Sequence, residues 1–143
     1  MPDVFSRTKR SWVMSRIHSF NTGLEAKFLS HASIVFYRKG FRYRKHCATL
    51  PGKPDIAFHK QRVAVFIDGD FWHGYNLTRL GKRPPNLYWK IKIEANMRRD
   101  RRVSRELRKL GWRVLRIWEH DVERHHLIVI NRIIRALDKV RPQ

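Results

Sequence analysis

Two short apolar runs separated by a polar turn stand at the centre of the hydrophobic pattern. Ile56–Phe58 and Val63–Ile67 are apolar throughout, and the four residues between them, His59 to Arg62, are polar. Apolar runs of this length joined by a short polar turn are typical of a β-hairpin. The pattern therefore predicts two antiparallel strands, with one strand beginning near Asp55 and the other ending at Asp68.

Stretches with apolar residues every three or four positions predict helices on both sides of the hairpin. The predicted helices cover Ser6–Phe20, Thr22 to about Lys39, about Asn86 to Leu110, and the residues after Val122. Thr22 and Glu25 match a capping box, which would begin the second helix. Gly40 and Gly111 follow the second and third helices, where a glycine often ends a helix.

Two further strands complete the predicted elements. Phe41–His46 and Trp112–Trp118 are short segments rich in aromatic or branched residues, which favours strands. Helices alternating with a few strands predict an α/β fold with a small mixed sheet flanked by helices. We expect residues 1–20 to form an N-terminal basic helical arm and residues 21–143 to form one domain.

The charge of the chain points to a polyanion as its partner. The 143 residues contain 32 Lys and Arg against 12 Asp and Glu, a formal net charge of +20. Such a charge favours binding to nucleic acid. A general basic protein bound to ribosomal RNA would share this composition. The single Cys47 excludes an internal disulfide and a multi-cysteine zinc site. No apolar run approaches the length of a membrane span, and we expect a cytoplasmic protein.

The few acidic residues are concentrated at the predicted hairpin. Asp55 opens the first strand and Asp68 closes the second, so antiparallel pairing would place the two carboxylates side by side. Asp70 and His73 follow closely. Neighbouring carboxylates are stabilised by a hard divalent cation, and Mg²⁺ fits oxygen ligands best. The hairpin therefore predicts a Mg²⁺ site with Asp55 and Asp68 as ligands.

Glu25 and Asp100 each allow two interpretations. Glu25 could return the capping hydrogen bond to Thr22, or its carboxylate could join the predicted site from the core-facing side of its helix. Asp100 interrupts the apolar stripe of the long helix, and a charge there needs a partner. That partner could be an arginine such as Arg42 or Arg44, or Asp100 could belong to the active site.

Basic side chains are densest along the long helix and the strand after it. They are Arg98, Arg99, Arg101, Arg102, Arg105, Arg108, Lys109, Arg113 and Arg116. Part of this set is expected to be a solvated face, and the rest suits contacts to phosphates, which position a duplex without reading its sequence. The affinity for DNA should therefore fall steeply with salt.

Several short motifs, in their order and spacing, resemble the very short patch repair (Vsr-type) endonucleases. The motifs are Arg10-Ser11 with Met14 and Ile17, Thr22 with Glu25, Pro51-Gly52 with Pro54-Asp55, Phe71-Trp72-His73, Trp89 with Lys92 and Asn96, Arg99-Asp100, Gly111-Trp112 and Ile117-Trp118-Glu119. That family nicks DNA at a thymine mispaired with guanine. Its fold is a variant of the restriction-endonuclease core.

The resemblance implies roles for individual residues. Asp55 would be the principal metal-binding carboxylate, His73 would activate the attacking water, and Glu25 and Asp68 would support the site. An aromatic wedge of Phe71, Trp72 and Trp89 would enter the base stack beside the mismatch, and Met14 and Ile17 would press on the DNA from the other groove. DNA contacts would come from Lys92, Asn96 and Arg99, and Asp70 and Asp100 would support the site. Phe71 and Trp72 could instead be ordinary core residues.

The sequence also departs from the family's pattern at several positions. Its structural zinc cysteines are replaced here by Asp70 and His120 and by Tyr75 and Asn76, so we expect no zinc. The predicted function is a Mg²⁺-dependent endonuclease that nicks double-stranded DNA at T:G mismatches and acts as a monomer. The alternatives are a nuclease of the same fold with a different DNA target, of the homing or phage type, and a non-catalytic nucleic-acid-binding protein.

Overall fold

Four strands form one mixed sheet, as the sequence predicts. The computed structural model describes residues 7–70 and 86–140, and for residues 7–22 it describes the backbone alone. The strands are β1 (Arg44–Lys45), β2 (Ile56–Phe58), β3 (Val63–Asp68) and β4 (Arg113–Trp118), in the order β1-β2-β3-β4. The pairs β1–β2 and β2–β3 are antiparallel, and β3–β4 is parallel.

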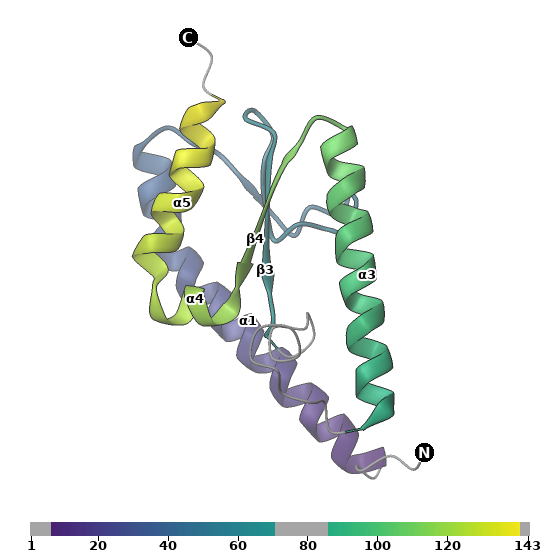
Figure 1. Cartoon of the computed structure of the whole chain (residues 1–143). Coiled ribbons are helices and arrows are strands. Elements are labelled where there is room, and N and C mark those ends of the chain that lie inside the picture. Colours follow the sequence, from purple (N-terminus) through teal and green to yellow (C-terminus); the bar gives the residue numbers. More distant parts are fainter. Residues whose placement is uncertain (1–6, 71–85, 141–143) are drawn as a thin grey trace.

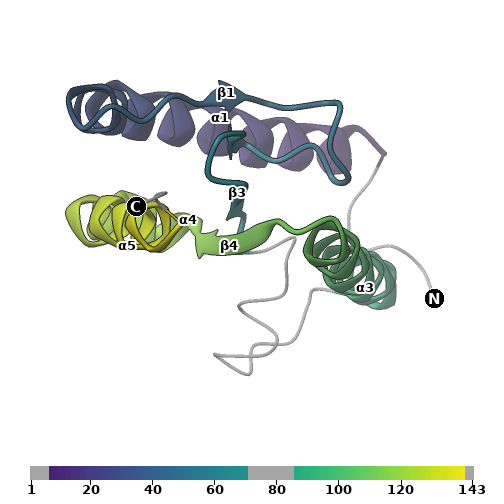
Figure 2. The ribbon, with the colours of Figure 1, turned by 90° about the horizontal axis from the view of Figure 1, so that it is seen from above.

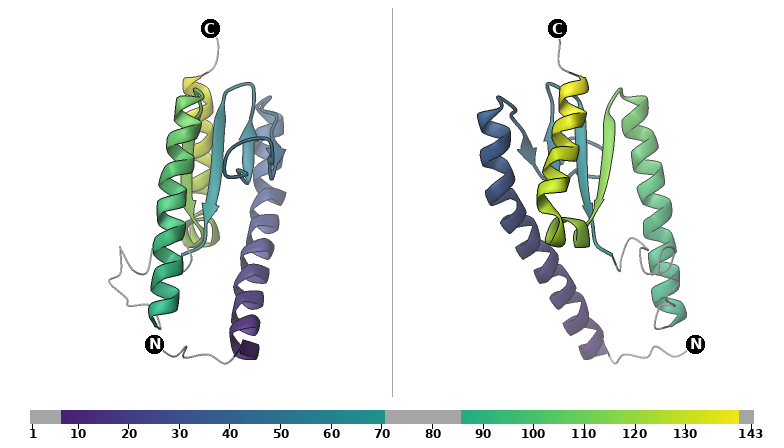
Figure 3. Two further views of the ribbon diagram at one scale, coloured as in Figure 1. Left: turned by 90° about the vertical axis from the view of Figure 1, so that its right-hand side faces the viewer. Right: turned by 60° about the vertical axis from the view of Figure 1, so that its left-hand side comes forward.

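Helices cover both faces of this sheet. They are α1 (Arg7–Arg38), α3 (Leu87–Lys109), α4 (Glu119–Arg124) and α5 (His126–Lys139). Helix α3 lies on one face, and α4 and α5 lie on the other (Figures 1 and 2). Both α1 and α3 extend beyond the ends of the strands (Figure 3). This three-layer arrangement confirms the predicted α/β fold with a small mixed sheet between helices.

Alternation along the strands explains why both faces are covered. Successive side chains of a strand point to opposite faces. Val63, Val65 and Ile67 therefore belong to the larger core, with residues of α1 and α5. Ala64 and Phe66 point the other way and pack in a smaller core that includes residues of α3. β3 is buried along its whole length, and this burial includes its polar last residue, Asp68.

Helix α1 differs from the prediction because it has no break near residue 20. It runs without interruption from Arg7 to Arg38, so the predicted helix start at Thr22 is wrong and the predicted boundary at residue 20 falls inside a helix. Gly23 is the weakest helix former beside Thr22, and a single glycine costs only about 1 kcal/mol in a helix. Glu25 therefore lies in the middle of a helix, where a capping role is excluded.

The other predicted ends of helices and strands agree more closely with the structure. Gly40, after α1, and Gly111, after α3, both have positive φ, of 85° and 87°. Helix α3 begins after Asn86, whose side chain accepts a hydrogen bond from the backbone N–H of Trp89. The strand predicted at Phe41–His46 shrinks to the two residues of β1, and the closing segment forms two helices, α4 and α5, with α5 beginning at His126.

Replacing Gly52 with alanine is expected to lower the free energy of unfolding by about 1–3 kcal/mol. Gly52 has a φ of 75°, and a Cβ there would overlap the Val103 side chain of α3. Urea denaturation measures the effect. Gly23→Ala is the control, because nothing lies within 4 Å of a Cβ at that position and alanine favours a helix. Equal stability of Gly52→Ala and wild type would contradict the packing described.

Candidate functional site

The hairpin brings Asp55 and Asp68 to one pocket, as the sequence predicts. Ile56 of β2 pairs with Val65 of β3, so Asp55 lies beside the end of β3. Its Oδ2 accepts a hydrogen bond of 2.7 Å from the backbone N–H of Ile67. Both aspartates line a pocket of about 410 Å³. The other charged residues of its wall are Lys53, Arg99, Asp100 and Arg116.

Within this pocket Asp68 is bound to Arg116. Both carboxylate oxygens of Asp68 accept hydrogen bonds from Nη1 of Arg116, at 3.0 and 3.3 Å, and the Asp68 side chain is 8% exposed. Parallel pairing sets Arg116 opposite Phe66, and the guanidinium lies 4.2 Å from the centre of that ring. Asp68 thus fixes Arg116, and its predicted role as a metal ligand stays a prediction.

Arg116 is also the partner of Asp100. Its Nη1 lies 3.6 Å from Oδ1 of Asp100, and its Nη2 donates a 3.0 Å hydrogen bond to the Asp100 backbone oxygen. Its Nε donates to Oγ of Ser104 at 2.9 Å. The expected arginine partner therefore exists, but it is Arg116 of β4 and not Arg42 or Arg44. Since Asp100 also lines the pocket, this ion pair is part of the pocket wall.

A second group of side chains is able to hold a metal ion. Glu25, His46 and Asp55 each place one ligand atom within 4.8 Å of the other two. Nε2 of His46 lies 3.0 Å from Oε1 of Glu25, and its Nδ1 lies 3.9 Å from Oδ1 of Asp55. The three residues come from α1, from the residue after β1 and from the residue before β2. Asp55 belongs both to this group and to the pocket.

His46 was not predicted to be a site residue. Pairing of Lys45 with Ile56 places residues 46 and 55 opposite each other, and the backbone N–H of His46 donates to the backbone carbonyl oxygen of Asp55 at 3.0 Å. His46 has a φ of 47°, an uncommon value for a residue with a side chain. The available signal was a histidine at a strand end that faces a predicted ligand, but using it requires the register of β1 and β2.

The environment of Glu25 favours a bound cation. Burial raises the pKa of Glu25, and the negative charge of Asp55 raises it further, while His46 and Lys45 oppose the change. Oε1 of Glu25 is buried and accepts no hydrogen bond of good geometry from the described residues, although His46 is close. A buried carboxylate beside a second one is stabilised by a divalent cation, and carboxylate oxygens suit Mg²⁺. The residues present therefore fit the predicted metal.

Replacing Glu25 with glutamine is expected to stabilise the metal-free protein at neutral pH. Because the pKa of Glu25 is raised in the folded state, wild type loses stability as the pH rises through that pKa, and glutamine removes the loss. The difference should vanish below the ordinary value of 4.5. Denaturation in EDTA at several pH values measures it. Glu123→Gln, at an exposed site of α4, should change little, and equal behaviour of both variants would contradict the expectation.

The other predicted DNA-contacting residues are placed only in part. Lys92, Asn96 and Arg99 lie on α3; Lys92 and Arg99 are exposed, and Asn96 is half-buried. Trp89 is 0% exposed, so the structure does not present it as a residue that could enter a base stack. Phe71, Trp72 and His73 lie outside the described residues, as do the side chains of Met14 and Ile17.

Asp70 and His120 contact each other where β3 and β4 end. Nδ1 of His120 lies 2.9 Å from Oδ1 of Asp70, and its Nε2 lies 3.5 Å from Oδ1 of Asp121. The backbone N–H of Asp70 also donates to Oε1 of Glu119 at 2.9 Å. These contacts connect the end of the hairpin to the start of α4 directly. Tyr75 and Asn76 lie outside the described residues.

None of the helices in the described part of the chain is both long enough and apolar enough to cross a lipid bilayer.

The amino-acid sequence is similar to those of known DNA endonucleases. A family model described as DNA mismatch endonuclease Vsr matches residues 2–79. Type II nicking enzyme V.NmeAIP of Neisseria meningitidis serogroup A is 37% identical over 144 residues, covering 96% of this chain and 97% of that protein. Type II nicking enzyme V.XorIIP of Xanthomonas oryzae pv. oryzae is 39% identical over 124 residues, covering 85% and 88%.

A third relative carries the family's own name. DNA mismatch endonuclease Vsr of Escherichia coli (strain K12) is 36% identical over 121 residues, covering 83% of this chain and 74% of that protein. The mixed sheet between helices agrees with the restriction-endonuclease-like core that the motifs predict. With a pocket of acidic and basic side chains at the end of its hairpin, the chain belongs to the Vsr family of DNA endonucleases.

Proposed function

We propose that this endonuclease nicks one strand of duplex DNA at T:G mismatches, using Mg²⁺ held by Glu25 and Asp55. The observation that carries the proposal is the position of Asp55, which belongs both to the group able to hold a metal and to the pocket that Arg99 lines. A cation bound by Asp55 would therefore meet a phosphate that enters the pocket. Relatives named nicking enzymes and a DNA mismatch endonuclease support the reaction and the target.

His46 acts as a positioning residue in this proposal. Mg²⁺ prefers oxygen ligands, so the two carboxylates bind it, and His46, 3.0 Å from Oε1 of Glu25, holds the Glu25 side chain toward Asp55. Partners of this kind orient metal ligands and tune their basicity. When bound, the ion supplies positive charge that stabilises the charge developing on the phosphoryl oxygens.

The remaining residues of the pocket bind the phosphate and complete the reaction. Arg99 is exposed at the pocket and offers a planar set of donors for phosphate oxygens. By the resemblance, His73 takes a proton from the attacking water, whose oxygen forms a bond to phosphorus as the bond to the leaving oxygen breaks. Histidine suits this step because its ordinary pKa lies near neutrality.

Selection of the mismatch is assigned to the aromatic wedge of Phe71 and Trp72, opposed by Met14 and Ile17. Opening a base step costs a few kcal/mol, and the cost is smaller at a mismatch. A wedge therefore enters a T:G site more readily than a paired one. Lys92, Asn96 and Arg99 on α3 contribute DNA contacts, and Asp100 supports the pocket through Arg116.

The test compares two end-labelled duplexes that differ at one base pair, T:G against T:A, each in Mg²⁺ and in EDTA. We expect one strand of the T:G duplex to be cut in Mg²⁺, with little cutting of the T:A duplex and none in EDTA. Equal cutting of both duplexes would indicate a nuclease with another target. Binding without any cutting would indicate a non-catalytic protein. Sedimentation of the complex with EDTA tests the further proposal that one monomer acts on each site.

A further inference from the structure

A groove rich in arginine lies between α3 and β4, beside the candidate active site. It has a volume of about 650 Å³ and is lined by Arg101, Arg105, Arg108 and Lys109 of α3, with Arg116 of β4 behind them. Asp100 and Arg116 line both this groove and the pocket of Asp55. The two cavities are therefore adjacent, and a chain-like ligand could pass from one to the other.

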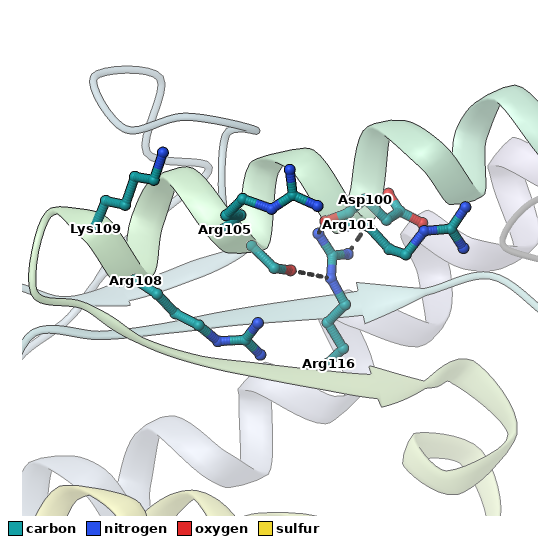
Figure 4. Close-up of a pocket in the computed structure, with 7 residues that line it drawn as sticks. Asp100, Arg101, Arg105, Arg108, Lys109 and Arg116 are labelled. Carbon is teal, nitrogen blue, oxygen red and sulfur yellow. Dashed lines mark hydrogen bonds and ion pairs between the residues drawn. The ribbon is translucent and has the colours of Figure 1, made fainter.

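The basic side chains of this groove differ in whether they have partners within the protein. Arg116 is fixed by Asp68, Asp100 and Ser104. Arg101, Arg105 and Arg108 are exposed and form no ion pair with another residue in the described part of the chain. Figure 4 shows their side chains leaving α3 around the held guanidinium of Arg116. The groove thus presents several cations that remain available to an anionic ligand.

The spacing of these side chains suits a series of phosphates. Residues three, four and seven apart in a helix share one face, which is the relation of Arg101, Arg105 and Arg108. At about 1.5 Å per residue, Arg105 and Arg108 lie roughly 7 and 12 Å along α3 from Asp100. Along the axis of a duplex, successive phosphates of one strand are spaced by about 3.4 Å. With α3 lying along that axis, the two arginines match phosphates about two to four nucleotides from one at the pocket.

We propose that this groove binds the DNA backbone on one side of the cleaved phosphodiester, about two to four nucleotides away, through Arg105 and Arg108. The proposal rests on the proposed function, because it takes the pocket of Asp55 as the place of the cleaved phosphate. The contacts give affinity and register without reading bases, since guanidinium groups bind phosphate oxygens irrespective of sequence.

The first test measures affinity against salt. Arg105→Gln/Arg108→Gln should lower the slope of log affinity against log salt by about 1.8 and weaken binding roughly 30-fold at 0.15 M salt, if each side chain neutralises one phosphate. The measurement is fluorescence anisotropy with a labelled T:G duplex in EDTA, which prevents cutting. The control is Arg132→Gln/Arg135→Gln, which removes the same charge from exposed sites of α5 on the other face of the sheet.

The outcomes separate this proposal from the proposed function. If the Arg105/Arg108 variant has the same affinity and slope as the α5 control, the groove does not bind DNA, whatever the enzyme cuts. If wild type cuts no duplex, the proposed function fails, and the salt slopes still show whether the groove binds DNA.

A second test locates the contacts. Single uncharged methylphosphonates, placed one to six nucleotides from the nick on either side, remove one phosphate charge at a time. Wild type should bind more weakly when the replacement lies about two to four nucleotides away on one side, and the Arg105/Arg108 variant should be insensitive to those same replacements. Identical profiles for the two proteins would overturn the placement.

Discussion

Asp55→Asn is expected to lower the rate of strand cutting by about 10³-fold or more. Asp55 is shared by the metal-capable group and the pocket, so its loss removes a ligand and displaces the cation from the phosphate. Metal stabilisation of a phosphoryl transition state contributes several kcal/mol, and each 1.36 kcal/mol changes the rate tenfold. Single-turnover cutting of the T:G duplex in Mg²⁺ measures the loss.

Binding separates a catalytic effect from a structural one. Asp55→Asn should bind the duplex in EDTA at least as tightly as wild type, because it removes a negative charge near the phosphates. Asp138→Asn, at an exposed site of α5, makes the same chemical change far from the pocket and should cut normally. The catalytic assignment is wrong if Asp55→Asn retains a rate close to that of the Asp138 control.

Arg116→Met is expected to lower the free energy of unfolding by about 3–5 kcal/mol, the usual cost of leaving a buried charge without its partner. Asp68 is 8% exposed and Asp100 is 17% exposed at the side chain, and Arg116 contacts both carboxylates. Methionine would keep much of the packing against Phe66 but would provide no counter-charge. Urea denaturation at neutral pH measures the change.

Two further variants make this result specific. Arg113→Met replaces an exposed arginine of the same strand and should change stability little. Asp68→Asn/Arg116→Met should recover part of the loss, because the amide does not require a cation. If the double variant is as unstable as the sum of its single changes, Arg116 does not stabilise the fold through Asp68.

The local pattern of the sequence predicted the elements well. The two apolar runs and the polar turn define β2 and β3, because strands buried on both faces must be apolar along their length. Glycine at positive φ marks the ends of α1 and α3. The capping-box sequence at Thr22 failed because the same residues are tolerated inside a helix, and local sequence alone does not show whether the preceding turn is also helical.

The long-range contacts of the site were predicted less well. The hairpin brought Asp55 to Asp68 because their separation depends only on a short turn. The binding of Asp68 to Arg116 depends on the parallel register of β3 and β4, which no local pattern determines. His46 was missed for the same reason, since its position opposite Asp55 follows from the pairing of β1 with β2.

The place of β4 as the last strand of the described sheet has a consequence for the behaviour of the protein at high concentration. The outer edge of such a strand can pair with the same edge of another molecule and begin aggregation. Arg113, the exposed arginine of β4, opposes this pairing, because two such edges repel each other. A short anionic polymer that neutralises Arg113 without spanning a full site should therefore promote precipitation, whereas the free protein should remain dispersed in low salt.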